Sequence, residues 1–246
     1  MKIRNSMIIV AVTCFLASPG LAQKYLKKDW HTWSLKDVTK IIHDSPWAQK
    51  WSNIDTTMDY NILNRNTTQG LSSSPPAPPI VLRFYSSLTM RRALLRLHQL
   101  RSKYDEMDAS QKEEFDQKNA GALICGNCNE YYVFILLQPT SETNKSIVAD
   151  DFKNETFETL KGNVSLIADN GEERELAHFI APADERGAAI FYFPIMNDKN
   201  QPLIDPKITK KITWKMKTGF YRNMYWVESP DFKISDMLID GSLDLD

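Results

Sequence analysis

Residues 131–138 read YYVFILLQ, an almost continuous run of aromatic and aliphatic side chains. A run of this length and composition indicates a buried β-strand. Further strand-like runs follow at short intervals, at residues 163–168, 173–180, 188–195, 211–217 and 223–228. The first two of these flank Asp169-Asn170-Gly171, a composition favoured in tight hairpin turns. We therefore predict an antiparallel, strand-rich region that starts at residue 131.

Two later runs alternate strictly between apolar and polar residues. In residues 211–217, KITWKMK, the apolar side chains share one face and the lysines and threonine share the other. We expect this strand to lie near the edge of a sheet, where lysines oppose pairing with another chain. Residues 242–246, SLDLD, alternate in the same way, so we expect Asp244 and Asp246 to be solvent-facing edge charges.

Before residue 131 we predict another strand, at residues 80–85, followed by helices. Apolar residues repeat at helical spacing over residues 90–104, while Arg91, Arg92 and Arg96 lie off that apolar face. Long cationic side chains usually solvate a helix face. The alternative is that these three arginines bind an anion such as phosphate or carboxylate.

Capping signals mark two helix starts. Ser34 is followed three residues later by Asp37, and Asp108 by Gln111, so each pair can form a capping box. Ser45-Pro46 ends the first helix and offers the start of another helical turn through residue 51.

The first helical segment is rich in tryptophan. Trp30, Trp33, Trp47 and Trp51 fall within 22 residues, which suggests docking on an apolar surface. Either these side chains pack on the sheet of this chain, or they dock onto a partner. Both interpretations stay open at the level of sequence.

Composition divides the chain into four parts. Residues 1–22 have the features of a secretory signal peptide: basic Lys2 and Arg4, an apolar run from Met7 to Leu16, and small residues before a cut at Gln23. Residues 23–63 form the helical N-terminal segment, and residues 64–79 form a disordered Ser/Pro-rich linker. Residues 80–246 form the main domain.

We predict an α+β protein in which an N-terminal helical segment and further helices pack on a C-terminal antiparallel β-sandwich of immunoglobulin-like type. The signal peptide predicts an exported protein, periplasmic or extracellular, and no later run is long enough to span a membrane. With 30 basic and 31 acidic residues the net charge is -1, so no overall field favours nucleic acid or acidic lipid.

Cys125-Gly126-Asn127-Cys128 is the constellation with the most specific spacing for chemistry. A disulfide is the default after export, and the loop-entropy relation assigns so short a loop roughly 2 kcal/mol. A redox pair requires the first cysteine at a helix N-terminus after a strand, whereas the order here is helix, cysteines, strand. A zinc site requires two further ligands, and free thiols are the remaining alternative.

Other catalytic signatures are missing from the sequence, including a phosphate-binding glycine loop, a nucleophile elbow and a metalloprotease helix. We therefore expect no cofactor and no metal. Sugar binding by aromatic residues such as Tyr221, Tyr225 and Trp226 is a further alternative, based on sandwich folds in general.

Three blocks of sequence carry a resemblance. They are WSLKDV at 33–38 with DSPWA at 44–48, VLRFYSSL at 81–88 with MRRAL at 90–94, and FKISDM at 232–237 before Gly241. On these blocks the chain resembles an uncharacterised family of bacterial secreted proteins, found mainly in soil bacteria. The cysteine pair is not part of the shared blocks. The resemblance implies export and a common architecture, and no activity is attached to it.

Taken together, these observations predict an exported, non-enzymatic protein that binds a protein or another envelope component. The alternative is a periplasmic thiol-disulfide or metal-dependent enzyme that uses Cys125 and Cys128.

Overall fold

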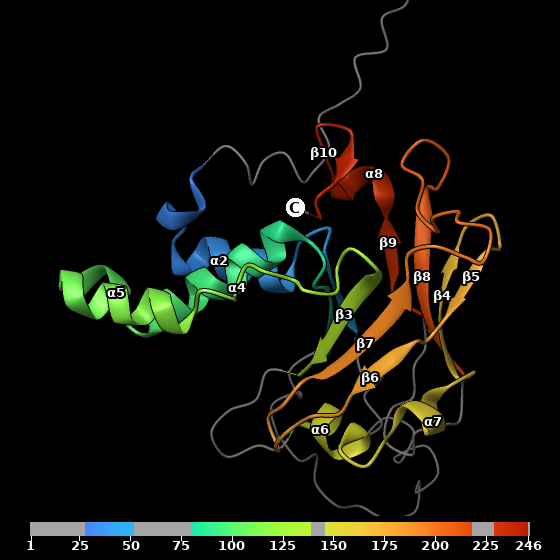
Figure 1. Cartoon of the computed structure of the whole chain (residues 1–246), viewed down its shortest axis with the longest axis horizontal. Coiled ribbons are helices and arrows are strands. Elements are labelled where there is room, and N and C mark those ends of the chain that lie inside the picture. The colour runs from blue at the N-terminus through green and yellow to red at the C-terminus, as the bar shows by residue number, and fades with distance from the viewer. Residues whose placement is uncertain (1–27, 52–79, 139–145, 218–228, 246) are drawn as a thin grey trace, which may run out of the picture.

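The computed structural model describes residues 28–51, 80–138, 146–217 and 229–245 (Figure 1). Helices and antiparallel strands alternate irregularly along these residues, as expected for an α+β protein. In chain order the elements are η1 Trp30–Thr32, α2 Leu35–His43, β1 Ala48–Trp51, β2 Ile80–Phe84, α4 Leu88–Arg101, η2 Tyr104–Glu106, α5 Ala109–Lys118, β3 Tyr131–Leu137, α6 Ile147–Phe152, α7 Phe157–Leu160, β4 Val164–Ala168, β5 Glu173–Glu175, β6 His178–Ile180, β7 Ala189–Pro194, β8 Lys211–Met216, β9 Asp231–Lys233, α8 Ile234–Met237, β10 Leu238–Ile239 and β11 Ser242–Leu243.

The larger sheet has five strands in the order β1-β2-β3-β7-β6, all paired antiparallel. The central strand, β3, is the apolar run at 131–138 that the sequence predicts as a buried strand. β3 pairs with β2 on one side and with β7 on the other, so segments from both halves of the chain meet there.

The smaller sheet has four strands in the order β5-β4-β8-β9, also antiparallel. The predicted hairpin is confirmed: Gly171 has φ +87, and β4 and β5 flank the turn. The predicted strand at 173–180 is wrong as a single element, since β5 belongs to the smaller sheet and β6 to the larger. The chain crosses at buried Leu176, whose N–H bonds to β4, while the next N–H, of Ala177, bonds to β7.

The two sheets share one hydrophobic core. The ring of Phe134 in β3 lies 5.4 Å from that of Phe232 in β9, and the ring of Phe191 in β7 lies 5.2 Å from that of Trp214 in β8. All four side chains are fully buried. β8 contributes alternate residues to this core, which accounts for the alternation of the sequence in residues 211–217.

Both predicted helix starts are confirmed. Ser34 and Asp37 form the capping box of α2, and Asp108 and Gln111 form that of α5. The expected helical turn over residues 46–51 is wrong, because residues 48–51 form β1 and pair with β2. Pairing with β2 gives these residues backbone hydrogen-bond partners along one side of the strand, which outweighs the local signal of Ser45-Pro46.

The C-terminal residues also depart from expectation. Asp244 is buried rather than solvent-facing, and its carboxylate accepts hydrogen bonds from Ser87 Oγ at 2.5 Å and Thr89 N at 2.8 Å. It therefore caps the N-terminus of α4, whose first backbone N–H groups have no partner within the helix. Asp246 lies outside the described residues.

Parts of the predicted organisation cannot be compared with the structure. The signal peptide at 1–22, the linker at 64–79 and the predicted strand at 223–228 lie outside the described residues. Within the described residues, no helix combines the length and apolar character needed to cross a membrane.

Candidate functional site

A cleft of about 440 Å³ is lined by residues from the start of β8, the end of β9, α8 and β10. Figure 1 shows where these four elements lie in the fold. We call this cleft the lysine cleft, because four of its eight lining residues are lysines. The lining residues are Pro206, Lys207, Thr209, Lys210, Lys211, Lys233, Ser235 and Leu238. They supply ammonium groups, two hydroxyls and two apolar side chains, and none of the eight is a carboxylate, an imidazole or a thiol.

The sheet register brings two of these lysines together. Lys211 is the first residue of β8 and Lys233 the last of β9, and the two are directly paired in the antiparallel ladder. Like charges directly opposite each other in a sheet oppose strand pairing. This pairing therefore costs stability, and a bound anion would offset the cost.

Few acidic groups balance the lysines. Lys211 Nζ lies 2.7 Å from Asp231 Oδ2, and the other carboxylate oxygen, Asp231 Oδ1, accepts a hydrogen bond from Thr213 Oγ1 at 2.5 Å. In the part of the chain that the structure describes, no carboxylate lies within ion-pair distance of Lys207, Lys210 or Lys233. Three ammonium groups are thus left to solvent or to a ligand.

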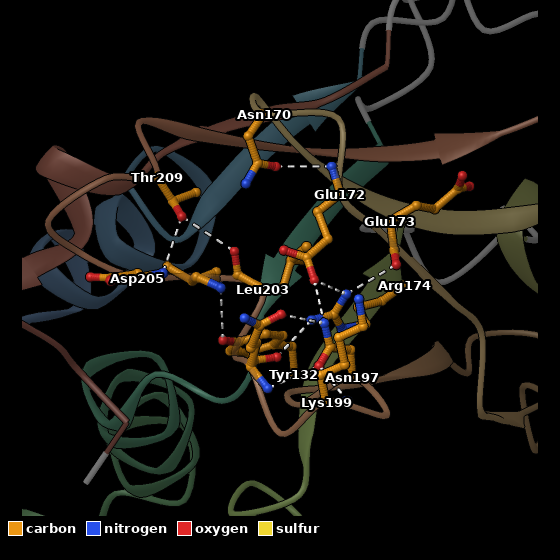
Figure 2. Close-up of polar contacts among 12 residues, drawn as sticks. Tyr132, Asn170, Glu172, Glu173, Arg174, Asn197, Lys199, Leu203, Asp205 and Thr209 are labelled. Atoms are coloured by element: carbon orange, nitrogen blue, oxygen red, sulfur yellow. Dashed lines mark hydrogen bonds and ion pairs between the residues drawn. The ribbon is translucent and has the colours of Figure 1, made fainter.

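The loop that carries Lys207 and Lys210 is held from behind by hydrogen bonds. Buried Thr209 accepts from the Asp205 N–H at 3.0 Å and donates to the Leu203 carbonyl at 3.2 Å (Figure 2). The Tyr132 hydroxyl accepts from the Ile204 N–H at 3.3 Å. Burial raises the pKa of Tyr132 to about 12, so this phenol stays neutral at physiological pH.

A buried arginine anchors the start of the same loop. Arg174 donates to Glu172 Oε1 and to the Gln201 carbonyl, each at 2.9 Å (Figure 2). Asn197 Nδ2 donates to the same Glu172 oxygen at 2.9 Å. These bonds tie the loop between β7 and β8 to the β4–β5 hairpin, so the cleft wall is supported by both sheets.

The predicted cysteine site is a disulfide in the structure, with the Cα atoms of Cys125 and Cys128 5.2 Å apart. Cys128 is buried, and its sulfur lies 3.3 Å from Ser86 Oγ. Cys125 follows the loop after α5 and does not begin a helix, so the pair lacks the helix N-terminus that a thioredoxin-like site requires. No group of three or more metal-ligating side chains is found among the described residues.

The predicted tryptophan site is only partly accessible. Trp33 and Trp47 are buried in the core of this chain, and Trp30 is partly buried against it, with its ring centroid 3.8 Å from that of His31 and the two rings tilted by 32°. Trp51 lies in β1, but its side chain is outside the described residues. The aromatic residues of the sugar-binding alternative, Tyr221, Tyr225 and Trp226, are also outside them. Partner docking by the four tryptophans stays a prediction.

The predicted anion site on α4 is engaged internally at two of its three positions. Arg91 donates to the carbonyls of Leu123, Ser86 and Leu245. Arg96 donates to the Trp33 carbonyl at 3.1 Å and binds both carboxylate oxygens of Asp105. Arg92 is half-buried. Anion binding by Arg91, Arg92 and Arg96 stays a prediction, and the structure does not bring the three guanidinium groups together on one ligand-facing surface.

A further buried cation escaped sequence reasoning. Arg83 in β2 donates to the Ile42 carbonyl at the end of α2 at 2.9 Å, and its Nη2 lies 3.4 Å from His43 Nδ1. Burial lowers the pKa of Arg83 to about 10, and burial beside this cation lowers the pKa of His43 to about 4. Arg83 therefore stays charged and His43 neutral at physiological pH. The contacts of Arg83 with Ile42 and His43 join α2 to the larger sheet.

Sequence reasoning also missed the lysine cleft. The signal for it is the cluster PKITKK at 206–211, but the alternating pattern over residues 211–217 predicts a strand near a sheet edge instead. β8 lies between β4 and β9, so its lysines do not guard a free edge. Lys233 lies 22 residues further on, and only the β8–β9 pairing brings it to the cleft.

Comparison with protein families, with curated proteins and with solved structures found no match to this chain.

Proposed function

We propose that the protein is an exported, non-enzymatic binding protein whose lysine cleft holds an anionic ligand of the cell envelope. The observation that carries this proposal is the set of three lysines, Lys207, Lys210 and Lys233, that have no carboxylate partner in the described structure. Export is supported by the signal-peptide features of residues 1–22.

The cleft suits binding better than catalysis. Its lysine ammonium groups are donors for phosphate or carboxylate oxygens, whereas the Thr209 hydroxyl already donates to the Leu203 carbonyl. Lysine, serine and threonine can act as nucleophiles when an adjacent base activates them, but none of the eight lining residues is a histidine or a carboxylate that could serve as that base. The hydrogen-bonded wall behind Thr209 and Gln201 fixes the loop in advance, which lowers the entropic cost of binding.

We further propose that the two sheets form a β-sandwich of the immunoglobulin-like type. Its support is the shared core, in which Phe134 and Phe191 of the larger sheet contact Phe232 and Trp214 of the smaller one. The crossing of the chain between sheets at Leu176 is also typical of two-sheet folds. In this arrangement the cleft lies at one end of the smaller sheet.

Titration of the purified mature protein with sodium tripolyphosphate by calorimetry tests the anion-binding proposal. Each ammonium–phosphate contact contributes about 1 kcal/mol near the surface, or roughly fivefold in affinity. The combined change Lys207→Ala, Lys210→Ala and Lys233→Ala is therefore expected to weaken binding about 100-fold.

The matched control changes Lys36→Ala and Lys40→Ala, two exposed lysines of α2 that lie away from the cleft (Figure 1). This control is expected to bind tripolyphosphate like the unaltered protein. Binding should also weaken as salt is raised, because exposed charges are screened. Equal affinity in the triple variant and the control, or no binding by the unaltered protein, would contradict the proposal.

A further inference from the structure

We propose that the anionic ligand is a phospholipid bilayer surface, into which Ile208 inserts while the surrounding lysines bind the headgroup phosphates. This inference rests on the proposed function, because it assigns the source of the anion that the lysine cleft binds. It adds an apolar contact that a soluble phosphate cannot make.

Ile208 is placed for this role by its loop. Its side chain is 68% exposed, although isoleucine is among the residue types most often buried. Its neighbours Lys207 and Thr209 both line the lysine cleft, and Ile208 itself is exposed beside that lining. The Ile208 N–H bonds to the Asp205 carbonyl at 3.0 Å, which holds the residue in a fixed turn.

The lining of the cleft continues this apolar character. Pro206 is the second residue of the turn, and Leu238 of β10 contributes a partly exposed side chain from the other wall. Apolar groups ringed by lysines match the interface of an acidic bilayer, where the lysines attract headgroups and apolar side chains enter the acyl boundary. A soluble polyanion would engage the lysines and leave Ile208 in water.

Exposure alone does not mark a membrane contact, and Ile124 shows the difference. It is 70% exposed, very close to the value for Ile208. Its surroundings, residues 121–127 (GALICGN), contain no charged residue, whereas Lys207 and Lys210, which have no carboxylate partner in the described structure, lie within two residues of Ile208. The acidic residue of this turn, Asp205, accepts a hydrogen bond from the backbone N–H of Lys207. Single exposed apolar residues are common, so the coincidence with unpaired lysines is what singles out Ile208.

The orientation of the sheet is compatible with docking at this end. β8 begins and β9 ends at the cleft, beside α8 and β10, while α2, α4 and α5 lie on the other side of the view (Figure 1). The loop is tied to the β4–β5 hairpin through Arg174 and to β3 through Tyr132. A membrane contact at Ile208 would therefore orient the whole body rather than a loose loop.

Co-sedimentation with vesicles tests this inference. Vesicles of phosphatidylcholine alone are compared with vesicles containing about 30% phosphatidylglycerol, at low salt and at about 0.15 M salt. We expect binding only to the acidic vesicles, weakened at the higher salt. The triple change Lys207→Ala, Lys210→Ala and Lys233→Ala should reduce partitioning about 100-fold, at roughly fivefold per lysine.

The change Ile208→Ser separates the bilayer from a soluble anion. It is expected to reduce vesicle partitioning about tenfold while leaving the affinity for tripolyphosphate within about twofold. The matched change Ile124→Ser should leave both unaltered. Circular dichroism confirms that each variant is folded before it is measured.

The outcomes distinguish this inference from the function on which it rests. If tripolyphosphate binds through the three lysines but acidic vesicles do not bind, the bilayer is excluded and the anion-binding function stands. If vesicles bind but Ile208→Ser behaves like Ile124→Ser, insertion is excluded. If neither probe binds, both proposals fail.

Discussion

Helix α4 and the lysine cleft are both rich in basic residues, but they use positive charge in opposite ways. Arg91 and Arg96 are buried, and their guanidinium groups bind carbonyls and a carboxylate of this chain. Lys207, Lys210 and Lys233 are exposed and have no carboxylate partner in the described structure. The first set joins segments of the fold, and the second set is available to a ligand.

The comparison teaches that a cluster of basic residues in sequence does not by itself identify an anion site. Arginine presents several donors in a fixed plane, so one buried side chain can join several carbonyls, as Arg91 does for Leu123, Ser86 and Leu245. Lysine carries a compact, strongly hydrated charge and is costly to bury. The side chains that remain free to bind are therefore the lysines.

The largest expected effect on stability comes from removing a buried arginine that donates hydrogen bonds within the chain. Arg91→Ala should lower the free energy of unfolding by about 3 kcal/mol, because it leaves buried carbonyls without a donor. Adjacent Arg92 makes no hydrogen bond or ion pair to the described residues. Arg92→Ala should therefore lower the free energy of unfolding by less than about 1 kcal/mol. Urea unfolding followed by tryptophan fluorescence measures both. Equal losses would show that the two arginines do not differ in role.

A smaller effect is expected where the C-terminal residues join α4. Asp244→Ala removes the cap that accepts from Ser87 and Thr89, and should cost about 1 to 2 kcal/mol in the same urea experiment. The control is exposed Asp198, for which no side-chain hydrogen bond is found in the described structure. Asp198→Ala should lower the free energy of unfolding by less than about 0.5 kcal/mol. A loss at Asp244 no larger than this control would mean that the cap is dispensable.

The smallest effect has the opposite sign and concerns the cleft. Lys233→Glu replaces a like-charge pair with Lys211 by an opposite-charge pair, so it should raise the free energy of unfolding by about 0.5 kcal/mol. The same change should weaken tripolyphosphate binding by more than about tenfold, since it removes one cation and adds an anion. The control is Lys215→Glu. Lys215 is paired with Ser165 rather than with a lysine, so this change should not raise the free energy of unfolding. If Lys233→Glu lowered the free energy of unfolding, the Lys211–Lys233 pair would not be costing stability, and a bound anion would have no such cost to offset.

Much of the local structure could be predicted from the residues. The capping boxes at Ser34 and Asp108, the hairpin at Gly171 and the buried strand β3 all arise from short-range patterns, because caps, turns and side-chain alternation involve neighbours in sequence. Where the local sequence pattern did not fix the secondary structure, pairing with neighbouring strands of a sheet did. Residues 48–51 joined β2 as a strand, and residues 173–180 divided between two sheets.

The candidate site could not be predicted in the same way. Charge counts were misleading, since residues 121–246 hold 13 basic and 20 acidic residues and still contain the lysine cleft. Lys211 and Lys233 meet through the register of β8 and β9, and Asp244 reaches α4 from 155 residues away in sequence. Neither meeting leaves a local pattern.

The sequence by itself determined the helix caps, the β4–β5 hairpin and the buried strand β3, because those features depend on residues within a few positions of each other, whereas sheet pairing decided residues 48–51 and 173–180. It also determined which side chains carry charge and which are apolar. The tertiary structure alone decided which charges are used inside and which stay free. Burial and partners depend on packing between distant segments, and these are the properties that turn Arg91 into an internal tie and leave Lys233 open to a ligand.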